Sequence, residues 1–418
     1  MTMKKNETRA ISPEMACDMI LKDIQPLGHE TITISEGYGR ILASDIISDI
    51  NIPPFDNSAM DGYALQAAST KSASRANPAA LSVEGEVQAG GVIFDGNLSG
   101  NRAIRIMTGA PVPEQADAVI PVEDTSEENN VVSIYRQISE GENVRRAGED
   151  ISLGQTVLKA GDRLNSADIG LLASLNIASI TVYRRPHVAV ISTGDEISDL
   201  GDDLKPGQIR NSNAYTLQSE ISKYNGVPHY IGIARDTIAH TREQFLKASE
   251  YDVIISTGGV SMGKYDYVAD VMKDMGIEIL IHSISMKPGK PCVFGKLGNK
   301  LFFGLPGNPV STMISFIEFV RPALLRLMGA SVINKPVVQA VLDEEIKKKP
   351  ERTHFIRGFF YMKEGTIHVT TTGPQGSGIL RSMHEANCLI ILPAHISLAE
   401  KGSLVSIQLI NHEEVPWA

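Results

Sequence analysis

The sequence predicts a multidomain α/β protein with a central doubly wound α/β domain, an inserted β-rich domain and a C-terminal β barrel. The chain has 418 residues, which is more than one core of ordinary size accommodates. Between residues 184 and 329, short Val/Ile runs alternate with helical segments, as in a doubly wound sheet. Outside that stretch, short apolar runs are broken by Gly, Pro and Asn, which is typical of β domains.

We expect five segments in chain order. Residues 1–50 begin the first domain, and their opening Ser-Pro pair favours an early helix. Residues 51–145 form the inserted β domain, and residues 146–183 complete the first domain. Residues 184–329 form the α/β domain and residues 330–418 the barrel. The last α/β helix begins with Asn308 as N-cap and Pro309 at its first position, and Pro322 should bend it.

Composition excludes several classes of partner. The net charge of −10 argues against a large nucleic-acid surface, since phosphate binding requires a basic patch. No run approaches the roughly 18 apolar residues of a membrane span. Cys17, Cys292 and Cys388 make no zinc pattern, which favours a reducing compartment. We therefore expect a cytoplasmic protein that binds neither nucleic acid nor membranes.

A glycine-rich loop, "STGGVSMGKYD", follows the apolar strand "DVIIS" and precedes a helix. Backbone N–H groups around Gly258, Gly259, Ser261 and Gly263 could converge on a phosphate beside that helix. The plainer alternative is a glycine turn that only connects strand and helix. Asp266 could hold a divalent cation beside the phosphate, or could simply complement the helix dipole.

Carboxylates follow two other predicted strands. Asp195 and Glu196 lie in "STGDEI", and Asp236 lies in "IARDT". Each alone is more often a helix cap or a solvated charge. Their recurrence at strand ends favours a function, because ligands of such sheets collect at the carboxyl ends of the strands.

Basic residues lie on a proline-stiffened turn. Lys287 and Lys290 in "MKPGKP" suit an oxyanion, since a rigid turn loses little entropy on binding. Arg357 in "FIRGFF" could complete an oxyanion clamp together with Ser377 in "TTTGPQGSG". The alternative for each is an ordinary surface position. In the inserted domain, "NIPPFDNSAMDGYAL" and "MTGAPVP" are explained by turn chemistry alone.

Seven stretches together, in this order, resemble the molybdopterin molybdenumtransferases of the bacterial MoeA type. They are "PPFDNSAMDGYA", "MTGAPVP", "STGDE", "STGGVSMGKYDYV", "KPGKP", "LPGNPVS" and "TGPQGSG". The chain is also similar to the E domain of gephyrin and to its plant counterpart. The resemblance covers nearly the whole chain, whereas the glycine loop alone is shared with the MogA-like molybdopterin adenylyltransferases.

The resemblance implies an elongated homodimer that takes adenylylated molybdopterin and molybdate, and releases AMP with the help of Mg²⁺. It implies Mg²⁺ binding by Asp236 and Asp266, and molybdate binding by Lys287, Lys290, Arg357 and Ser377. The family's active-site positions fall on Asp61, Thr108, Glu196, Asp236, Asp266, Lys287, Arg357 and Ser377.

Two alternative functions stay open at this point. A molybdopterin adenylyltransferase, itself a possible partner, would not need the flanking β domains. A dimeric scaffold of the gephyrin type would not need the retained acidic and basic residues. One departure from the family is Ser283, where some members carry a basic residue, and His282 could substitute for it. Nothing in the sequence separates molybdate from tungstate.

Overall fold

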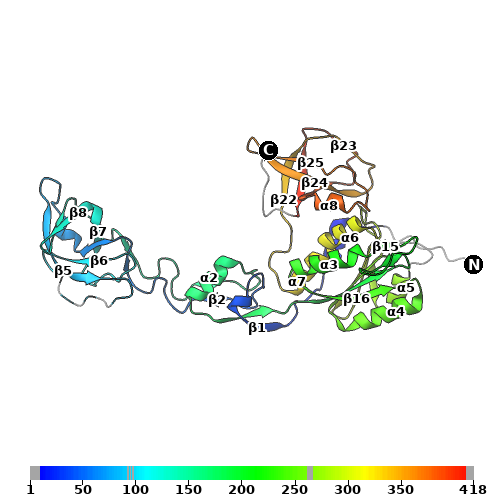
Figure 1. The fold of residues 1–418 in the computed structure, drawn as a ribbon, viewed down its shortest axis with the longest axis horizontal. Coiled ribbons are helices and arrows are strands. Elements are labelled where there is room, and N and C mark those ends of the chain that lie inside the picture. The colour runs from blue at the N-terminus through cyan, green and yellow to red at the C-terminus, as the bar shows by residue number, and fades with distance from the viewer. Residues whose placement is uncertain (1–9, 92–93, 95, 97, 261–266, 411–418) are drawn as a thin grey trace, which may run out of the picture.

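The structure is a computed structural model that describes residues 10–91, 94, 96, 98–260 and 267–410. Figure 1 shows an elongated molecule: a β-rich arm extends from an α/β region, and the C-terminal barrel packs beside that region. Within the described ranges, no helix is long and apolar enough to cross a membrane.

The arm consists of a base and a tip. At its base, β1 (His29–Thr33) pairs antiparallel with β12 (Ser179–Tyr183), and β2 (Ile46–Ile47) pairs with β11 (Thr156–Leu158). The chain therefore leaves and re-enters the α/β region side by side. Helix α2 (Ser166–Ser174) lies here, with Asn165 Oδ1 accepting from the N–H groups of its first turn.

The tip of the arm is a six-stranded sheet in the order β7-β4-β6-β5-β9-β8. Its two faces pack against separate apolar cores. A short pair, β3 with β10, joins the tip to the base. The bounds are β3 (Asn57–Ser58), β4 (Gly62–Leu65), β5 (Ala79–Val87), β6 (Arg102–Ile106), β7 (Ala118–Pro121), β8 (Thr125–Glu128), β9 (Val131–Ile134) and β10 (Val144–Arg145).

The α/β region contains a second six-stranded sheet, in the order β16-β13-β17-β21-β20-β18. The first four strands are parallel, and β20 and β18 add an antiparallel edge. The bounds are β13 (His187–Thr193), β16 (Val227–Ala234), β17 (Val253–Thr257), β18 (Glu278–Ile281), β20 (Val293–Leu297) and β21 (Lys300–Leu305), with a separate parallel pair β14 (Ile197–Ser198) and β15 (Ile209–Arg210).

Helices cover both faces of this sheet, as a doubly wound fold requires. Along β13, Val188 and Val190 join one core, while Ala189 and Ile191 join the other. The first core contains residues of α1 (Pro13–Leu21), α3 (Ser212–Lys223), α6 (Pro309–Ser315) and α7 (Arg321–Leu327). The second contains residues of α4 (Ile238–Lys247) and α5 (Val268–Asp274).

The helix expected to bend at Pro322 is irregular there. It begins at Asn308 and Pro309 as predicted, and a π-helical turn, Phe316–Val320, separates α6 from α7. Pro322 has no N–H to donate, so the regular i to i−4 pattern is interrupted at this point. The interruption places Arg321 at the start of α7.

The C-terminal region is a closed five-stranded barrel, β24-β25-β22-β28-β26, because β24 pairs with both β25 and β26. Strand β19 (Met286–Lys287) of the α/β region adds to β24 in parallel. The predicted fold class is therefore confirmed. The bounds are β22 (Val337–Leu342), β23 (Ile346–Lys347), β24 (Thr353–Lys363), β25 (Thr366–Thr371), α8 (Arg381–His384), β26 (Cys388–Leu392), β27 (Leu398–Ala399) and β28 (Leu404–Leu409).

Candidate functional site

The carboxyl ends of the parallel strands surround a cavity of about 430 Å³, which we call the crest pocket. Four predicted site residues line it: Glu196, Asp236, Gly258 and Gly259. They come together because the sheet order places β13 between β16 and β17. The expectation that these strand ends meet at one edge is confirmed.

The glycine loop starts in a conformation that requires glycine. Gly258 has φ +93°, and a Cβ there would lie 2.6 Å from Thr193 Oγ1 and 2.9 Å from the Thr193 carbonyl oxygen. The backbone of β17 can therefore turn closely over β13 only without a side chain. The predicted positions Ser261, Gly263 and Asp266 lie outside the described residues.

The loops after β13 and β16 hold each other. The N–H of Asp195 donates to Asp236 Oδ2, and the N–H of Asp236 donates to Asp195 Oδ1, both at 3.3 Å. Arg235 donates to the carbonyl of Ile197 at 3.0 Å. These bonds fix two carboxylates beside Glu196, and carboxylate oxygens are the ligands that Mg²⁺ takes in proteins. Within the described residues, however, no three His, Cys, Asp or Glu side chains are grouped closely enough to hold a metal ion, so this edge supplies part of a cation site at most.

Several residues that line the crest pocket have no counterpart in the sequence prediction, and Asn213 is one of them. Asn213, in the first turn of α3, donates its amide to Thr257 Oγ1 at 2.8 Å and to the Gly307 carbonyl at 2.7 Å. It thereby ties the last residue of β17 to the loop that follows β21. The signal in the sequence is the polar run "RNSNAY" at a helix start, which by itself indicates only a helix cap.

A second cavity, about 540 Å³ in volume, lies between the α/β region and the barrel; we call it the basic pocket. The parallel pairing of β19 with β24 places Lys287 opposite His354. Lys287 and Arg357 both line this pocket, although 70 positions separate them in the chain. Cations that the sequence prediction missed surround them: Lys347, Lys348, Lys349 and Arg352.

Arg357 is a buried cation without an acidic partner. Its side chain is 1% exposed; Nε donates to Ser382 Oγ at 3.0 Å, and a terminal nitrogen donates to the Gly376 carbonyl at 3.1 Å. No carboxylate in the described part of the chain pairs with it. Burial lowers the pKa of Arg357 to about 10. A buried, unneutralised guanidinium beside a cavity favours an anionic ligand.

His354 responds to the same environment. Burial, followed by the charges of Lys348 and Lys287, lowers its pKa to about 4. The imidazole is therefore neutral at neutral pH and can offer one N–H without adding charge. Lys348 is held in place by the carbonyls of Arg352 and Ala394, at 3.0 and 3.4 Å.

The turn that carries the two predicted lysines separates them. Lys287 and Pro288 line the basic pocket, whereas Pro291 lines the crest pocket. Lys290 is exposed and lines neither pocket, and its carbonyl accepts from Ile284 at 3.0 Å. The turn therefore connects the two pockets, although only the first lysine enters one of them.

Gly289 sets the path of that turn, and Ser377 connects the barrel region to the start of α6. Gly289 has φ +105°, and a Cβ there would lie 2.9 Å from the buried Ser315 Oγ. The carbonyl of Ser377 accepts from the N–H of Val310, in the first turn of α6, at 3.0 Å. Ser377 thus lies near the start of α6, and the structure brings it to neither lining.

Asp61 and Thr108 contact each other in the arm. Asp61 Oδ1 accepts from the N–H of Thr108 at 2.7 Å and from its hydroxyl at 2.8 Å. These two hydrogen bonds hold the pKa of Asp61 below its ordinary value. The arm tip lies far from the sheet and barrel that form the two pockets (Figure 1). Within one chain, the structure does not bring this pair to either pocket.

These features define a doubly wound α/β protein with an inserted β arm and a C-terminal barrel, in which a glycine- and carboxylate-lined pocket at the strand ends adjoins a pocket lined by cations. Family models match three parts of the chain: "MoeA N-terminal region (domain I and II)" over residues 11–176, "Probable molybdopterin binding domain" over 189–326, and "MoeA C-terminal region (domain IV)" over 339–410. Together they span both pockets and the arm.

Named relatives agree with the family models. The chain is 38% identical to the molybdopterin molybdenumtransferase of Haemophilus influenzae, covering 93% of this chain and 95% of the relative. It is 34% identical to that of Bacillus subtilis, covering 93% and 92%. The molybdopterin biosynthesis MoeA protein of Pyrococcus horikoshii has the same fold, with a TM-score of 0.83 and 31% identity over 96% of this chain and all of that chain. The chain belongs to the molybdopterin molybdenumtransferase family, whose members are transferases of molybdenum cofactor biosynthesis.

Proposed function

We propose that this chain inserts molybdate into adenylylated molybdopterin and releases AMP with a divalent cation, preferably Mg²⁺. The observation that carries the proposal is the pair of adjoining pockets joined by the Lys287–Pro291 turn. One pocket is built from glycine backbone and carboxylates, which suits a phosphate with its cation. The other is built from cations, which suits a free oxyanion.

The basic pocket is the proposed molybdate site. Arg357 supplies a fixed guanidinium that folding has already removed from water. An anion that binds there pairs with this charge, and the cation pays no further desolvation cost. Lys287 supplies a second cation from the opposite wall. Ser377 and Lys290 belong to the proposal through the family resemblance, and a small rearrangement of their loops would be needed to bring their side chains in.

The crest pocket is the proposed site of the adenylate. The Gly258 N–H donates to the Leu305 carbonyl at 3.0 Å, so the N–H of Gly259 is the group of this turn that would serve a phosphate, and Asn213 links the end of β17 to the loop after β21. Asp236, with Asp266 from outside the described residues, would hold the cation, and Glu196 lies beside Asp236. When bound, the cation would neutralise charge on the phosphoanhydride.

A direct assay tests the proposal. Purified protein is incubated with adenylylated molybdopterin, Mg²⁺ and molybdate, and both AMP and active cofactor are measured. We expect both products, with cofactor formation dependent on molybdate. A parallel reaction with ATP and unmodified molybdopterin tests the adenylyltransferase alternative. Formation of adenylylated product there, with no AMP release in the first reaction, contradicts the proposal.

We further propose that the protein acts as a homodimer in the cytoplasm. The distance of Asp61 and Thr108 from both pockets supports a composite site, in which the arm of one subunit reaches the pockets of the other (Figure 1). The free state of Cys17, Cys292 and Cys388 agrees with a reducing compartment. A molybdopterin adenylyltransferase is the proposed supplier of the substrate.

A further inference from the structure

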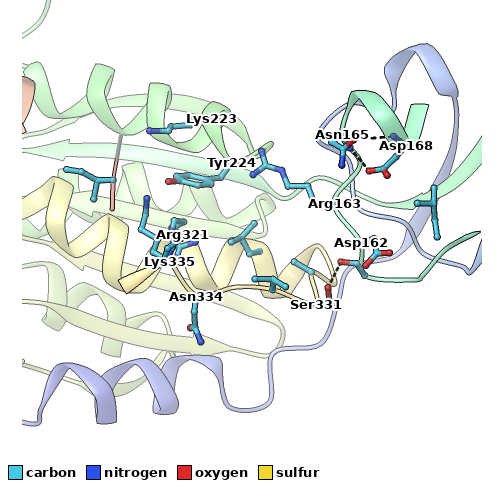
Figure 2. A pocket seen from close by; sticks show the side chains of 17 residues that line it. Asp162, Arg163, Asn165, Asp168, Lys223, Tyr224, Arg321, Ser331, Asn334 and Lys335 are labelled. Carbon is cyan, nitrogen blue, oxygen red and sulfur yellow. Dashed lines mark hydrogen bonds between the residues drawn. The ribbon is translucent and has the colours of Figure 1, made fainter. Parts of the chain in front are cut away.

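A third cavity, of about 1070 Å³, lies where the arm meets the α/β region; we call it the junction cavity. Figure 2 shows its lining side chains. It shares no lining residue with the crest pocket or the basic pocket. Residues 161–165 come from the arm, Lys223 and Tyr224 from the end of α3, and residues 330–336 from the link to the barrel. The cavity is therefore a separate space between parts of the chain that are distant in sequence.

Cations gather around one aromatic ring in this cavity. The guanidinium carbon of Arg321 lies 5.6 Å from the ring centroid of Tyr224, Nζ of Lys335 lies 5.7 Å away, and Nζ of Lys223 lies 5.9 Å away. In Figure 2, the side chain of Arg163 points toward the same ring from the arm. A neutral ring compensates such charges only in part. The cluster therefore combines four like charges that repel one another.

Acidic groups in the lining are fewer and are otherwise engaged. Two carboxylates, Asp162 and Asp168, line the cavity. Each accepts a backbone N–H from its own turn, at 2.8 and 2.7 Å. Within the described ranges, neither forms an ion pair with Arg163, Arg321 or Lys335. The lining of the cavity therefore carries more cations than carboxylates.

The carboxylate nearest in sequence to Arg321 compensates it weakly. Burial raises the pKa of Glu318 to about 7, and Gln408 donates to its Oε1 at 2.6 Å. Burial, and then the charges of Arg321 and Lys223, lower the pKa of Lys335 to about 8, against the opposing effect of Glu220. Burial is the largest cause of this lowered pKa, the neighbouring cations add to it, and Glu220 and Glu318 oppose it; an added anion would also favour the charged form of Lys335.

We propose that the junction cavity binds a small phosphate-bearing anion with at least two negative charges. Arginine and lysine side chains converge on it from the arm, α3, α7 and the link to the barrel, as multidentate recognition of phosphate requires. The cavity is large enough for a nucleotide-sized ligand. The ring of Tyr224 is 8% exposed and already faced by cations, so the phosphate rather than a base provides the recognition.

Binding there would also fix the arm. The arm and the link already meet through Ser331, whose N–H and hydroxyl both donate to the Gly161 carbonyl at 3.0 Å. An anion held by Arg163 on one side and Lys335 on the other adds a second connection across the same junction. Since the arm carries Asp61 and Thr108, occupancy would set where that pair is presented.

The test is hydrogen exchange on the full-length protein, read by mass spectrometry, with inorganic pyrophosphate and with adenosine diphosphate as probes. Lys335→Gln removes one cation of the cavity. Lys71→Gln makes the same charge change on the exposed surface of the arm tip and serves as the matched control. Slower exchange in residues 158–168 and 329–336 reports the junction cavity, whereas slower exchange in 347–357 reports the basic pocket.

We expect both probes to protect the two junction segments in the wild type and in Lys71→Gln, and the probe concentration needed to rise tenfold or more in Lys335→Gln. Stronger protection by the nucleotide would assign the site to nucleotides, and equal protection would assign it to the phosphate group itself. Protection confined to 347–357, or unchanged by Lys335→Gln, overturns the proposal. A change of subunit association in Lys335→Gln without any junction protection also overturns it, because the cations would then serve a second copy of the chain.

Discussion

The sharpest test of the proposed function is Arg357→Met, which keeps the length of a buried side chain and removes its charge. In the wild type, Arg357 is 1% exposed and donates to Ser382 Oγ and the Gly376 carbonyl. Both groups keep a hydrogen-bond partner after the change. Ser382 Oγ still donates to the Ile379 carbonyl at 2.7 Å, and Gly376 is exposed to water. The variant should therefore fold.

The magnitudes separate stability from binding. Burial lowers the pKa of Arg357 to about 10, well below its ordinary value, so the folded state bears a cost on the order of 3 kcal/mol for holding the charge at neutral pH. Because the folded pKa is the lower one, this cost is present at all pH values below about 10. Methionine removes the cost and loses two hydrogen bonds of about 1 kcal/mol each. We expect the unliganded variant to be as stable as the wild type or slightly more stable.

The affinity for molybdate should fall, although the stability of the unliganded protein does not. Loss of one charge-assisted contact, about 1.5 to 3 kcal/mol, raises the dissociation constant roughly 10- to 150-fold. Calorimetric titration with molybdate, and separately with adenylylated molybdopterin, measures both. Lys363→Met, an exposed change on the same strand, is the matched control. An equal loss for the two ligands, or a loss confined to the pterin, would show that the basic pocket serves the adenylate and that the oxyanion lies elsewhere.

Four further outcomes are expected. Asp236→Asn should reduce AMP release at least 100-fold while molybdate titration is unchanged, since an amide is a poor substitute for a carboxylate at a hard cation; near wild-type release would refute the metal role. Mixed oligomers of Asp61→Ala and Asp236→Asn subunits should regain activity that neither variant has, and no recovery despite verified subunit exchange would place the whole site in one chain. Gly258→Ala should lower stability by about 1–3 kcal/mol and weaken pterin binding, because its Cβ would overlap the side chain and carbonyl of Thr193; denaturant melts and titration check this. The pKa of His354 is about 4 in the folded protein, so the unfolded chain binds a proton at this imidazole more readily. The free energy of unfolding should therefore fall as pH drops from 6.5 to 4. In denaturant titrations, His354→Gln should lose less stability than the wild type over that range.

The sequence predicted the local elements well because their signals are local. The alternation of Val/Ile runs with helical segments identified the parallel strands, and the glycines and carboxylates after β13, β16 and β17 marked the edge where the crest pocket lies. Asn308 and Pro309 likewise begin α6 as expected. These features depend on residues within one turn or one strand end of each other, so periodicity and turn chemistry suffice to find them.

The two sides of the basic pocket were predicted only as separate pieces. Lys287 and Arg357 meet because β19 pairs with β24, and no local pattern encodes a pairing between strands so distant in the chain. The same pairing places His354 beside Lys287, which the sequence analysis did not anticipate. Lys290 has the same residue type as Lys287 and lies on the same turn, yet it is exposed and lines neither pocket; Gly289, with its positive φ, lies between the two lysines.

The sequence by itself thus determined the fold class, the family and the crest of the sheet, since composition, period and ordered short stretches carry that information. Tertiary structure alone decided which cations share a pocket. It also placed Asp61 and Thr108 away from both pockets of their own chain. Finally, it brought four cations from distant segments around Tyr224 at the junction. The physical reason is that the burial of a side chain and the pairing of its charge depend on its position in the folded structure and not on its residue type. A guanidinium such as that of Arg357 is an ordinary surface cation until long-range strand pairing removes it from water without supplying a carboxylate.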